Sequence, residues 1–354
     1  MRKLNWVLAG IGDIARRRVI PAIQTEPRSN LYGFVTRDAA KAAAYPGARA
    51  FKSVEEAVAD PQVDALYIAL PVAMHADAAI AALRAGKHVL CEKPIAMHYT
   101  QAERMVAEGV ASSRVIGVSY YRRLYPKLIH AKKLIAEGAI GQPVLAEGNC
   151  HGWLESEERA WLRDPALAGG GSLFDIASHR IDAMNFLFGR AEAATGIMSN
   201  AVHKLPVEDS ATVMMKFAGG VHGIVDVRWN SRIPRDQFRV VGTEGEIGLD
   251  PLNGPELRLT TRNATVIETL PPHKNIHYPI VENFVGAALA DDPELLACPA
   301  VQAADTDWVI EQVMRAQKQL PASLAAVELV LRVFRGCGKT HHIEQFPKRQ
   351  RSRG

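Results

Sequence analysis

Near its N-terminus the chain reads Leu4-Asn5-Trp6-Val7-Leu8-Ala9-Gly10-Ile11-Gly12-Asp13-Ile14-Ala15, a largely apolar run followed by a glycine turn. The run predicts a buried strand, and the residues after the turn predict a helix that continues to residue 23. The pattern is G-x-G-x-x-A, in which Gly10 makes the turn, Gly12 lets a pyrophosphate approach, and small Ala15 packs helix on strand. We therefore favour a dinucleotide site at this helix N-terminus over an ordinary glycine turn.

Strand-like and helix-like segments alternate through the next hundred residues. Strands are expected at residues 31–36, 65–70, 89–91 and 115–119, and helices at residues 54–58, 75–85 and 100–109. This alternation predicts an α/β domain with a parallel sheet and right-handed crossovers, which binds ligands at the C-terminal ends of its strands. Gly10, Thr36, Pro71 and Glu92 all lie at such ends.

The tip of the second strand, Thr36-Arg37-Asp38, bears on the choice of cofactor. A hydroxyl followed by an arginine suits the 2′-phosphate of NADP, whereas an acidic residue would bind the ribose hydroxyls of NAD. Arg37 favours NADP, and Asp38 keeps NAD open. Both residues could also be solvated loop charges.

A second glycine-rich stretch, Gly169-Gly170-Gly171-Ser172, lies near the middle of the chain. Ser172 is expected to cap a helix on which Asp175, His179 and Asp182 follow at i, i+4 and i+7 and therefore line one face. A purely structural role remains possible, because Asp175 could complete a capping box and His179 could be a packed histidine. Apolar neighbours surround the polar line, and buried ionisable groups are costly unless they are partnered or used.

A lysine follows the strand at residues 89–91, in the sequence Cys91-Glu92-Lys93-Pro94. At a strand tip that faces a cofactor crevice, its ammonium could hold a substrate oxygen, although most lysines are solvated surface charges.

The sequence pattern changes between residues 143 and 270. There, short runs in which apolar and polar residues alternate with period two are separated by glycine turns at Gly219-Gly220, Gly242 and Gly254. This pattern predicts a largely antiparallel sheet that carries the triglycine helix on one face. Its other face, with Ile224 or Val225, would need cover.

Composition excludes several classes of protein. With 354 residues, of which 48% are hydrophobic, the chain can form two packed domains. The net charge of +4 comes largely from the C-terminal Lys348, Arg349, Arg351 and Arg353, so no nucleic-acid surface is expected. No apolar run is long enough to span a membrane. The dispersed cysteines, without a signal peptide, predict reduced thiols in a cytoplasmic protein: Cys91, Cys150, Cys298 and Cys337.

Taken together, the motifs resemble the glucose-fructose oxidoreductase, inositol dehydrogenase and rhizopine catabolism (Gfo/Idh/MocA) family of NAD(P)-dependent oxidoreductases. The resemblance covers roughly residues 1–318 and rests on Gly10-x-Gly12-x-x-Ala15, Glu92-Lys93-Pro94, and the triglycine followed by Asp175, His179 and Asp182. It implies a Rossmann domain at residues 1–122 and an α+β substrate-binding and oligomerisation domain with an open sheet at residues 123–320. Residues 321–354 are expected to form a helical appendage and a basic tail.

The resemblance also implies catalytic roles, in which Lys93 positions the substrate oxygen, Asp175 helps orient the substrate, and His179 is the acid/base. The chemistry agrees, because oxidising an alcohol requires an acceptor for the hydroxyl proton and a positive charge beside the oxygen. Substrate contacts are predicted from Lys93, Tyr121, Arg122, Asp175 and His179. Cofactor contacts are predicted from Gly10, Ile11, Gly12, Asp13, Ile14, Thr36, Arg37, Leu70, Pro71, His75, Glu92, Lys93, Trp161 and Arg163. No metal is predicted.

Several positions stay open. At the expected domain boundary, Arg122 or Arg123 could contact substrate hydroxyls or tie the domains together. Arg163 is displaced by one residue from the arginine of the relatives, and their late-helix tyrosine could correspond to His277 or Tyr278.

The predicted function is hydride transfer between a nicotinamide cofactor, NADP rather than NAD, and a sugar, polyol or related compound. The alternatives are a glycosidase that uses bound NAD transiently and a nucleotide-sensing regulator without turnover. The family buries its open sheet face against a second subunit, so a homodimer or homotetramer is implied.

Overall fold

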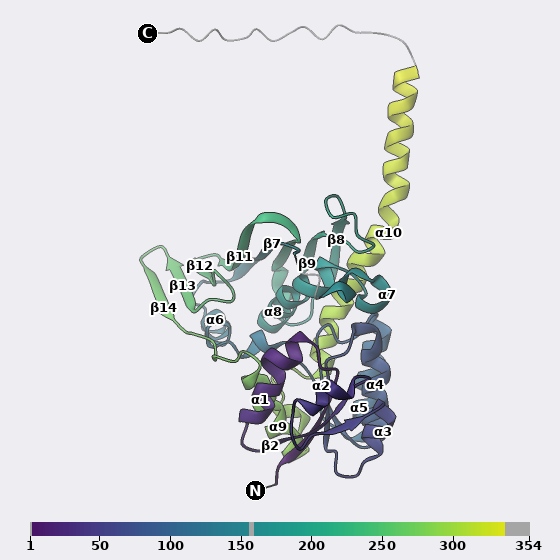
Figure 1. Ribbon diagram of the computed structural model, residues 1–354. Coiled ribbons are helices and arrows are strands. Elements are labelled where there is room, and N and C mark those ends of the chain that lie inside the picture. The colour runs from purple at the N-terminus through teal and green to yellow at the C-terminus, as the bar shows by residue number, and fades with distance from the viewer. Residues whose placement is uncertain (1, 156–158, 337–354) are drawn as a thin grey trace, which may run out of the picture.

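The computed structural model describes residues 2–155 and 159–336, with side chains as far as residue 318. Cys337 and the basic residues of the predicted tail lie outside the described residues. Two sheets organise the chain, one in each domain, and the long last helix runs past both of them (Figure 1).

The first sheet has six parallel strands in the order β3-β2-β1-β4-β5-β6. The strands are β1 (Leu4–Ala9), β2 (Ser29–Val35), β3 (Arg49–Phe51), β4 (Ala65–Ile68), β5 (His88–Cys91) and β6 (Ile116–Val118). This is the strand order of a dinucleotide-binding Rossmann domain, in which the crevice lies where the order reverses, beyond β1 and β4. The predicted parallel α/β domain is confirmed.

Helices cover both faces of this sheet. They are η1 (Ala15–Val19), α1 (Ile20–Thr25), α2 (Ala39–Ala43), α3 (Val54–Ala59), η2 (Val72–Met74), α4 (His75–Arg84), α5 (Tyr99–Ser112) and, much later in the chain, α9 (Tyr278–Ala290). Trp6 is fully buried, and its ring lies 5.1 Å from that of Phe284 in α9. The chain therefore returns to the first core after leaving it, which the predicted division at residue 122 does not describe.

The second sheet has eight strands in the order β14-β13-β12-β11-β7-β10-β9-β8. They are β7 (Pro143–Trp153), β8 (Ala193–Ser199), β9 (Ser210–Lys216), β10 (His222–Arg228), β11 (Asn230–Gly242), β12 (Gly245–Gly248), β13 (Glu256–Thr261) and β14 (Thr265–Thr269). The pair β7 and β10 is parallel, and the other neighbours are antiparallel. The prediction of a mostly antiparallel sheet is confirmed.

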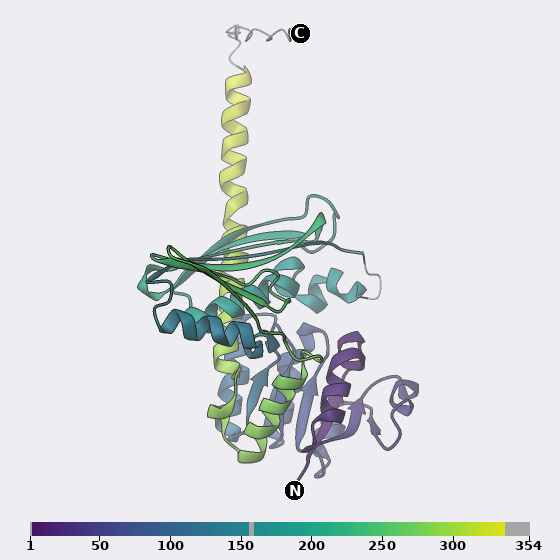
Figure 2. The ribbon, with the colours of Figure 1, turned by 90° about the vertical axis from the view of Figure 1, so that its left-hand side faces the viewer.

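One face of the second sheet is covered and the other is open. The covering helices are α6 (Pro126–Ala136), η5 (Leu173–Ala177) and α8 (Ser178–Phe188), which Figure 2 shows between the two sheets. Val225 points into this core, whereas its neighbour Ile224 is half-buried on the open face, where Ile197 and Met214 are exposed. Short helices complete the chain: η3 (Tyr121–Leu124), η4 (Ala160–Arg163), α7 (Pro165–Ala168), η6 (Ala218–Gly220) and η7 (Pro293–Leu295).

The last helix, α10 (Ala300–Gly336), joins the two domains and then leaves them. Its first half packs against α5, α8, β6 and β8, and its second half projects from the body (Figures 1 and 2). Within the described residues, no helix combines the length and the apolar character that crossing a membrane requires.

Candidate functional site

The triglycine turn starts the helix that carries Asp175 and His179, but it does so differently from the prediction. Ser172 makes no capping hydrogen bond, and its hydroxyl is buried. Instead, Oε1 of Glu208 accepts hydrogen bonds from the backbone N–H groups of Gly171 and Leu173, both at 2.8 Å. A Cβ at Gly171 would lie 2.0 Å from the Glu208 carbonyl oxygen, so the glycine is required by this approach. The prediction of a Ser172 cap is therefore wrong, because a distant carboxylate serves the same N–H groups.

Lys93 and Asp175 meet across the two domains. The Lys93 ammonium, just beyond β5, donates to the Asp175 backbone carbonyl at 2.6 Å and lies 3.4 Å from Oδ1 of its carboxylate. Arg159 donates to the same Oδ1 at 2.8 Å. Burial would raise the pKa of Asp175, but Lys93 and Arg159 outweigh it and lower that pKa. Burial lowers the pKa of Lys93, against the opposing effect of Asp175 and Glu92.

His179 lies on the same helix, four residues further on, and is 6% exposed. Its ring meets Tyr120 edge-on and has its centre 5.3 Å from that of Tyr121. Its Nδ1 is buried without a hydrogen-bond partner among the described residues. Burial, followed by the charges of Arg122 and Lys93, lowers its pKa well below the ordinary value. The imidazole is therefore neutral at neutral pH and can accept a proton.

Asp182, the third residue of the predicted polar face, belongs to a different contact. It forms a bidentate ion pair with Arg123, with Nη2 of Arg123 at 2.7 Å and Nε at 3.0 and 3.1 Å from its oxygens. Arg123 also donates to Gln302 of α10 at 2.6 Å. Of the two candidate arginines, Arg123 therefore ties the chain together, whereas Arg122 lies close enough to His179 to lower its pKa.

A second carboxylate borders Lys93. Glu92 accepts a hydrogen bond from the Tyr67 hydroxyl at 2.7 Å and lies 3.5 Å from Nε2 of His277. His277 is fully buried, and its ring centre lies 4.6 Å from that of Tyr121. The neighbouring Tyr278 instead stacks on His273 and donates to Glu282. Of these two alternatives, His277 is the one that reaches the site.

The glycine turn after β1 fits a nucleotide. Gly10 has φ +97°, and a Cβ there would lie 2.6 Å from the Ala69 carbonyl oxygen, so the turn itself requires this glycine. A Cβ at Gly12 would meet no protein atom within 4 Å. The protein's own packing therefore does not require Gly12, as expected if a ligand approaches there. Ile11, Asp13 and Ile14 complete the turn, and within the described part of the chain no side chain caps the helix that follows.

At the tip of β2 the two charged residues have different surroundings. Asp38 accepts a hydrogen bond from the Ala40 N–H and caps α2, and its backbone N–H binds the Thr36 hydroxyl. Arg37 is exposed.

The remaining predicted cofactor residues lie around the end of β4. His75 places one ring nitrogen 2.9 Å from the Leu70 carbonyl oxygen and the other 3.0 Å from that of Pro94. It thereby links the end of β4, before Pro71, to the loop that carries Lys93. Trp161 and Arg163 are partly buried in η4, ahead of α7, and α7 packs against η2 of the first domain.

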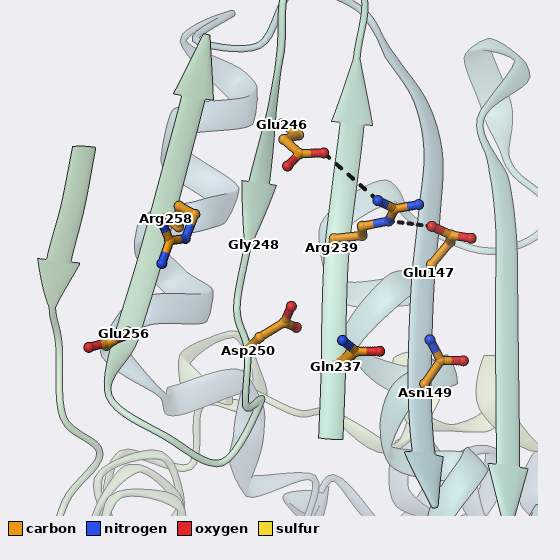
Figure 3. A pocket seen from close by; sticks show the side chains of 9 residues that line it. All are labelled: Glu147, Asn149, Gln237, Arg239, Glu246, Gly248, Asp250, Glu256 and Arg258. Atoms are coloured by element: carbon orange, nitrogen blue, oxygen red, sulfur yellow. Dashed lines mark hydrogen bonds and ion pairs between the residues drawn. The ribbon is translucent and has the colours of Figure 1, made fainter. Parts of the chain in front are cut away.

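A separate hollow of about 490 Å³ lies on the open face of the second sheet (Figure 3). Its walls include Arg239, which forms ion pairs with both Glu147 and Glu246, and none of the predicted site residues is among the residues that line it. It lies on the sheet strands β7, β11, β12 and β13, and Lys93 is not among its lining residues. No group of three or more His, Cys, Asp or Glu side chains within the described residues could hold a metal ion.

Sequence reasoning missed Arg159, Glu208 and Asn253, the last of which holds Arg122. No motif marks these residues, because each reaches the site from a loop that only the tertiary structure brings close.

Two family models match the chain. Residues 4–120 match the oxidoreductase family with an NAD-binding Rossmann fold, and residues 128–248 match the GFO/IDH/MocA C-terminal domain. Among curated proteins, the 1,5-anhydro-D-fructose reductase of Ensifer adhaerens is 34% identical over 275 residues, which cover 75% of this chain and 82% of that protein.

Solved structures show the same fold. An aldose-aldose oxidoreductase from Caulobacter crescentus, complexed with glycerol, superposes with a TM-score of 0.80 at 25% identity, covering 90% of this chain and 98% of that one. A levoglucosan dehydrogenase, in complex with NADH and levoglucosan, gives a TM-score of 0.80 and the same coverage at 23% identity.

Proposed function

Because the chain belongs to the GFO/IDH/MocA family of oxidoreductases, we propose that it transfers a hydride between a nicotinamide cofactor and a sugar, polyol or related carbonyl compound. The contact between Lys93 and Asp175 beside the neutral His179 carries this proposal. It joins a positive charge and a proton acceptor at the C-terminal edge of the parallel sheet, where a Rossmann domain binds its ligand.

The proposed mechanism assigns separate tasks to these side chains. A nicotinamide cofactor held at the turn of Gly10 and Gly12 would supply the hydride chemistry, so the tasks of this chain's own residues are to align the reactants and to manage a proton and a charge. Lys93 binds the substrate oxygen and stabilises the negative charge that develops there. His179 accepts the hydroxyl proton during oxidation and returns it during reduction. Asp175 binds the ammonium of Lys93, and Arg159 donates a hydrogen bond to the same Asp175 carboxylate oxygen.

We propose NADP as the preferred cofactor. Asp38 already caps α2, which leaves it poorly placed to bind ribose hydroxyls as well. Arg37 is exposed at the same strand tip, and among the described residues none forms a hydrogen bond or ion pair with it. It can therefore bind a 2′-phosphate.

Replacing Arg37 tests this preference. Arg37→Ala should weaken NADP binding by roughly 10- to 100-fold and leave NAD nearly unchanged, since a charged hydrogen bond contributes about 1.5–3 kcal/mol. Titration of both reduced cofactors, followed by protein fluorescence, measures the effect. Equal losses for both cofactors would assign Arg37 a structural role.

The open face of the second sheet suggests a homodimer or homotetramer. Ile197 and Met214 are 60% and 51% exposed there, which a monomer would leave in water. Light scattering after size-exclusion chromatography tests this, and a monomer at micromolar concentration would contradict it.

The direct test of function is a panel of sugars, polyols and ketoses incubated with NADP and NAD and followed by cofactor absorbance. Net reduction or oxidation of free cofactor supports the proposal. Cleavage of a glycoside without net cofactor change would instead indicate a glycosidase. Cofactor binding without any turnover would indicate a regulator.

A further inference from the structure

Arg122 is a buried cation beside the proposed catalytic residues. It is 7% exposed, and its guanidinium lies 4.9 Å from the centre of the Tyr121 ring. Its Nε and Nη2 donate to Oδ1 of Asn253 at 3.1 and 2.8 Å. Its Nη1 has no hydrogen-bond partner among the described residues. A neutral amide oxygen is thus the only acceptor bonded to this charge within the described part of the chain.

The arginine is held in a fixed position. The backbone N–H of Asn253 donates to the Asp236 carboxylate at 3.0 Å, which fixes the backbone from which the side-chain amide reaches Arg122. Below the same loop, the fully buried Lys127 donates to the backbone carbonyls of Leu249 and Pro251 at 3.2 and 2.6 Å. Supported donors of this kind are typical of a binding site.

The nearby carboxylates are already committed to other partners. Asp175 binds Lys93 and Arg159, Asp236 binds Arg180, Asp182 binds Arg123, and Glu92 binds Tyr67. None of these carboxylates is bonded to Arg122 within the described residues. The charge of Arg122 therefore lacks a bonded counter-charge there, and buried charges are normally paired.

The charge of Arg122 acts on both proposed catalytic residues. After burial, Arg122 is the largest influence that lowers the pKa of His179, and it also lowers that of Lys93. Tyr121, on which the guanidinium lies, contacts the rings of both His179 and His277. Arg122 therefore borders the same space as the proposed acid/base.

We propose that Arg122 binds a carboxylate on the substrate, so that the protein acts on a sugar acid, an aldonate or uronate, rather than on a neutral sugar. This inference rests on the proposed hydride transfer and names its substrate class. A neutral hydroxyl could accept a hydrogen bond from Arg122 but would leave its charge uncompensated. A phosphate carries about −1.5 to −2 at pH 7 and would exceed the single charge of Arg122, whereas a carboxylate matches that charge and the guanidinium fork.

The test compares matched pairs of compounds, D-glucuronate with D-glucose and D-gluconate with D-glucitol. The holoenzyme should show a kcat/KM at least roughly 10-fold higher for the acid in at least one pair. Arg122→Gln should lower kcat/KM for that acid by roughly 10- to 100-fold more than for its neutral partner, so that the preference for the acid is lost. Arg122→Lys should recover part of the loss, because it keeps the charge without the planar fork. Arg84→Gln, a surface arginine paired with Glu108, is the matched control and should leave both values unchanged.

Two further readouts separate this inference from a folding defect and from failure of the proposed function. Arg122→Gln should move the acid limb of the kcat/KM profile for a neutral substrate to higher pH, because removing the charge raises the pKa of His179. Calorimetric titration with D-glucuronate and D-gluconate, in the absence of turnover, should show binding that Arg122→Gln abolishes.

Such binding without turnover of any compound would overturn the proposed function and support Arg122 as a carboxylate-binding site, the anion site. Turnover of neutral sugars at least as good as that of the acids, with no effect of Arg122→Gln on the preference, would overturn the anion site alone. Failure of every acid to bind would also overturn it, and exclusive preference for a sugar phosphate would assign Arg122 to a phosphate.

Discussion

The helix formed by η5 and α8 carries two ion pairs to distant parts of the chain, and the pairs differ in how completely they are satisfied. Near its start, Asp175 meets Lys93 in a contact that mixes a backbone carbonyl, a 3.4 Å ion pair and a second cation. Two turns later, Asp182 and Arg123 form a buried bidentate pair that Gln302 completes. Burial opposes the charge of Arg123, but Asp182 outweighs burial and raises the pKa of Arg123.

The difference in hydrogen bonding indicates a structural role for the pair of Asp182 and Arg123 and a catalytic role for the residues around Lys93. Asp182 and Arg123 bond to each other and to Gln302, so they hold η3, α8 and α10 together and leave few free hydrogen-bonding groups for a ligand. Around Lys93, by contrast, Nδ1 of His179, both ring nitrogens of His277 and Nη1 of Arg122 lack hydrogen-bond partners among the described residues. An incompletely satisfied polar cluster in a crevice is where a substrate can bind.

The largest expected effect on turnover comes from removing the charge of Lys93. Lys93→Ala should lower kcat by roughly 10³-fold or more, because it removes the positive charge that stabilises the developing oxyanion. Combined with His179→Ala, the loss should be much smaller than the product of the two single losses, since the residues act as one unit. Steady-state kinetics on the best substrate of the panel measure both effects.

The matched control is Lys133→Ala, which removes a surface lysine of α6 paired with Glu137 and should leave kcat unchanged. Fully multiplicative losses in the double variant would show that Lys93 and His179 act independently.

Breaking the satisfied pair should damage stability. Arg123→Met leaves the buried Asp182 without its cation and should lower the free energy of unfolding by about 3–5 kcal/mol. Adding Asp182→Leu should recover much of this loss, because a buried pair is often replaceable by apolar side chains. Urea unfolding followed by circular dichroism measures both variants. A loss below about 1 kcal/mol for Arg123→Met would contradict a stabilising role for the ion pair of Asp182 and Arg123.

The smallest expected effect concerns Asp307 of α10, which connects the last helix to the reactive loop. Its Oδ1 accepts a hydrogen bond from the Ala96 N–H at 3.1 Å, and its Oδ2 is buried without a hydrogen-bond partner among the described residues. Burial raises the pKa of Asp307 to about 8. An unfolded aspartate titrates near pH 3.9, so between about pH 4 and pH 8 the native state binds the extra proton. This contribution to stability is therefore complete below about pH 4 and is lost as the pH rises through about 8.

Asp307→Asn keeps the acceptor for Ala96 and removes the titration. The variant should match the wild type near pH 4 and exceed its melting temperature at pH 9. Thermal melts across this range check the prediction, and parallel pH curves for the two proteins would refute it.

The sequence predicted what local spacing determines. The glycine turn at Gly10 and Gly12, the alternating strands of the first domain and the period-two pattern of the second all appear where expected, because their determinants lie within a few residues. Lys93 and Asp175 could be paired in advance only through the family resemblance, since they are 82 residues apart.

The errors and omissions share one physical origin. Ser172 looked like a helix cap, but the carboxylate of Glu208, 36 residues later in the chain, takes that role, and the helix begins with a π-helical segment, Leu173–Ala177. The return of α9 to the first core is likewise invisible to local patterning, because only the packing of Phe284 against Trp6 reveals it. Tertiary partners overrode local propensity in both places.

The central claim, that the incompletely satisfied cluster performs the chemistry, is tested most directly by His179→Ala. The measurement is kcat at saturating substrate together with the dissociation constant of the cofactor and the melting temperature. Turnover should fall by roughly 10²- to 10⁴-fold, because general acid/base catalysis contributes about that much, with cofactor affinity and stability largely unchanged. Near-normal turnover in this variant would contradict the claim and move the proton acceptor elsewhere in the crevice.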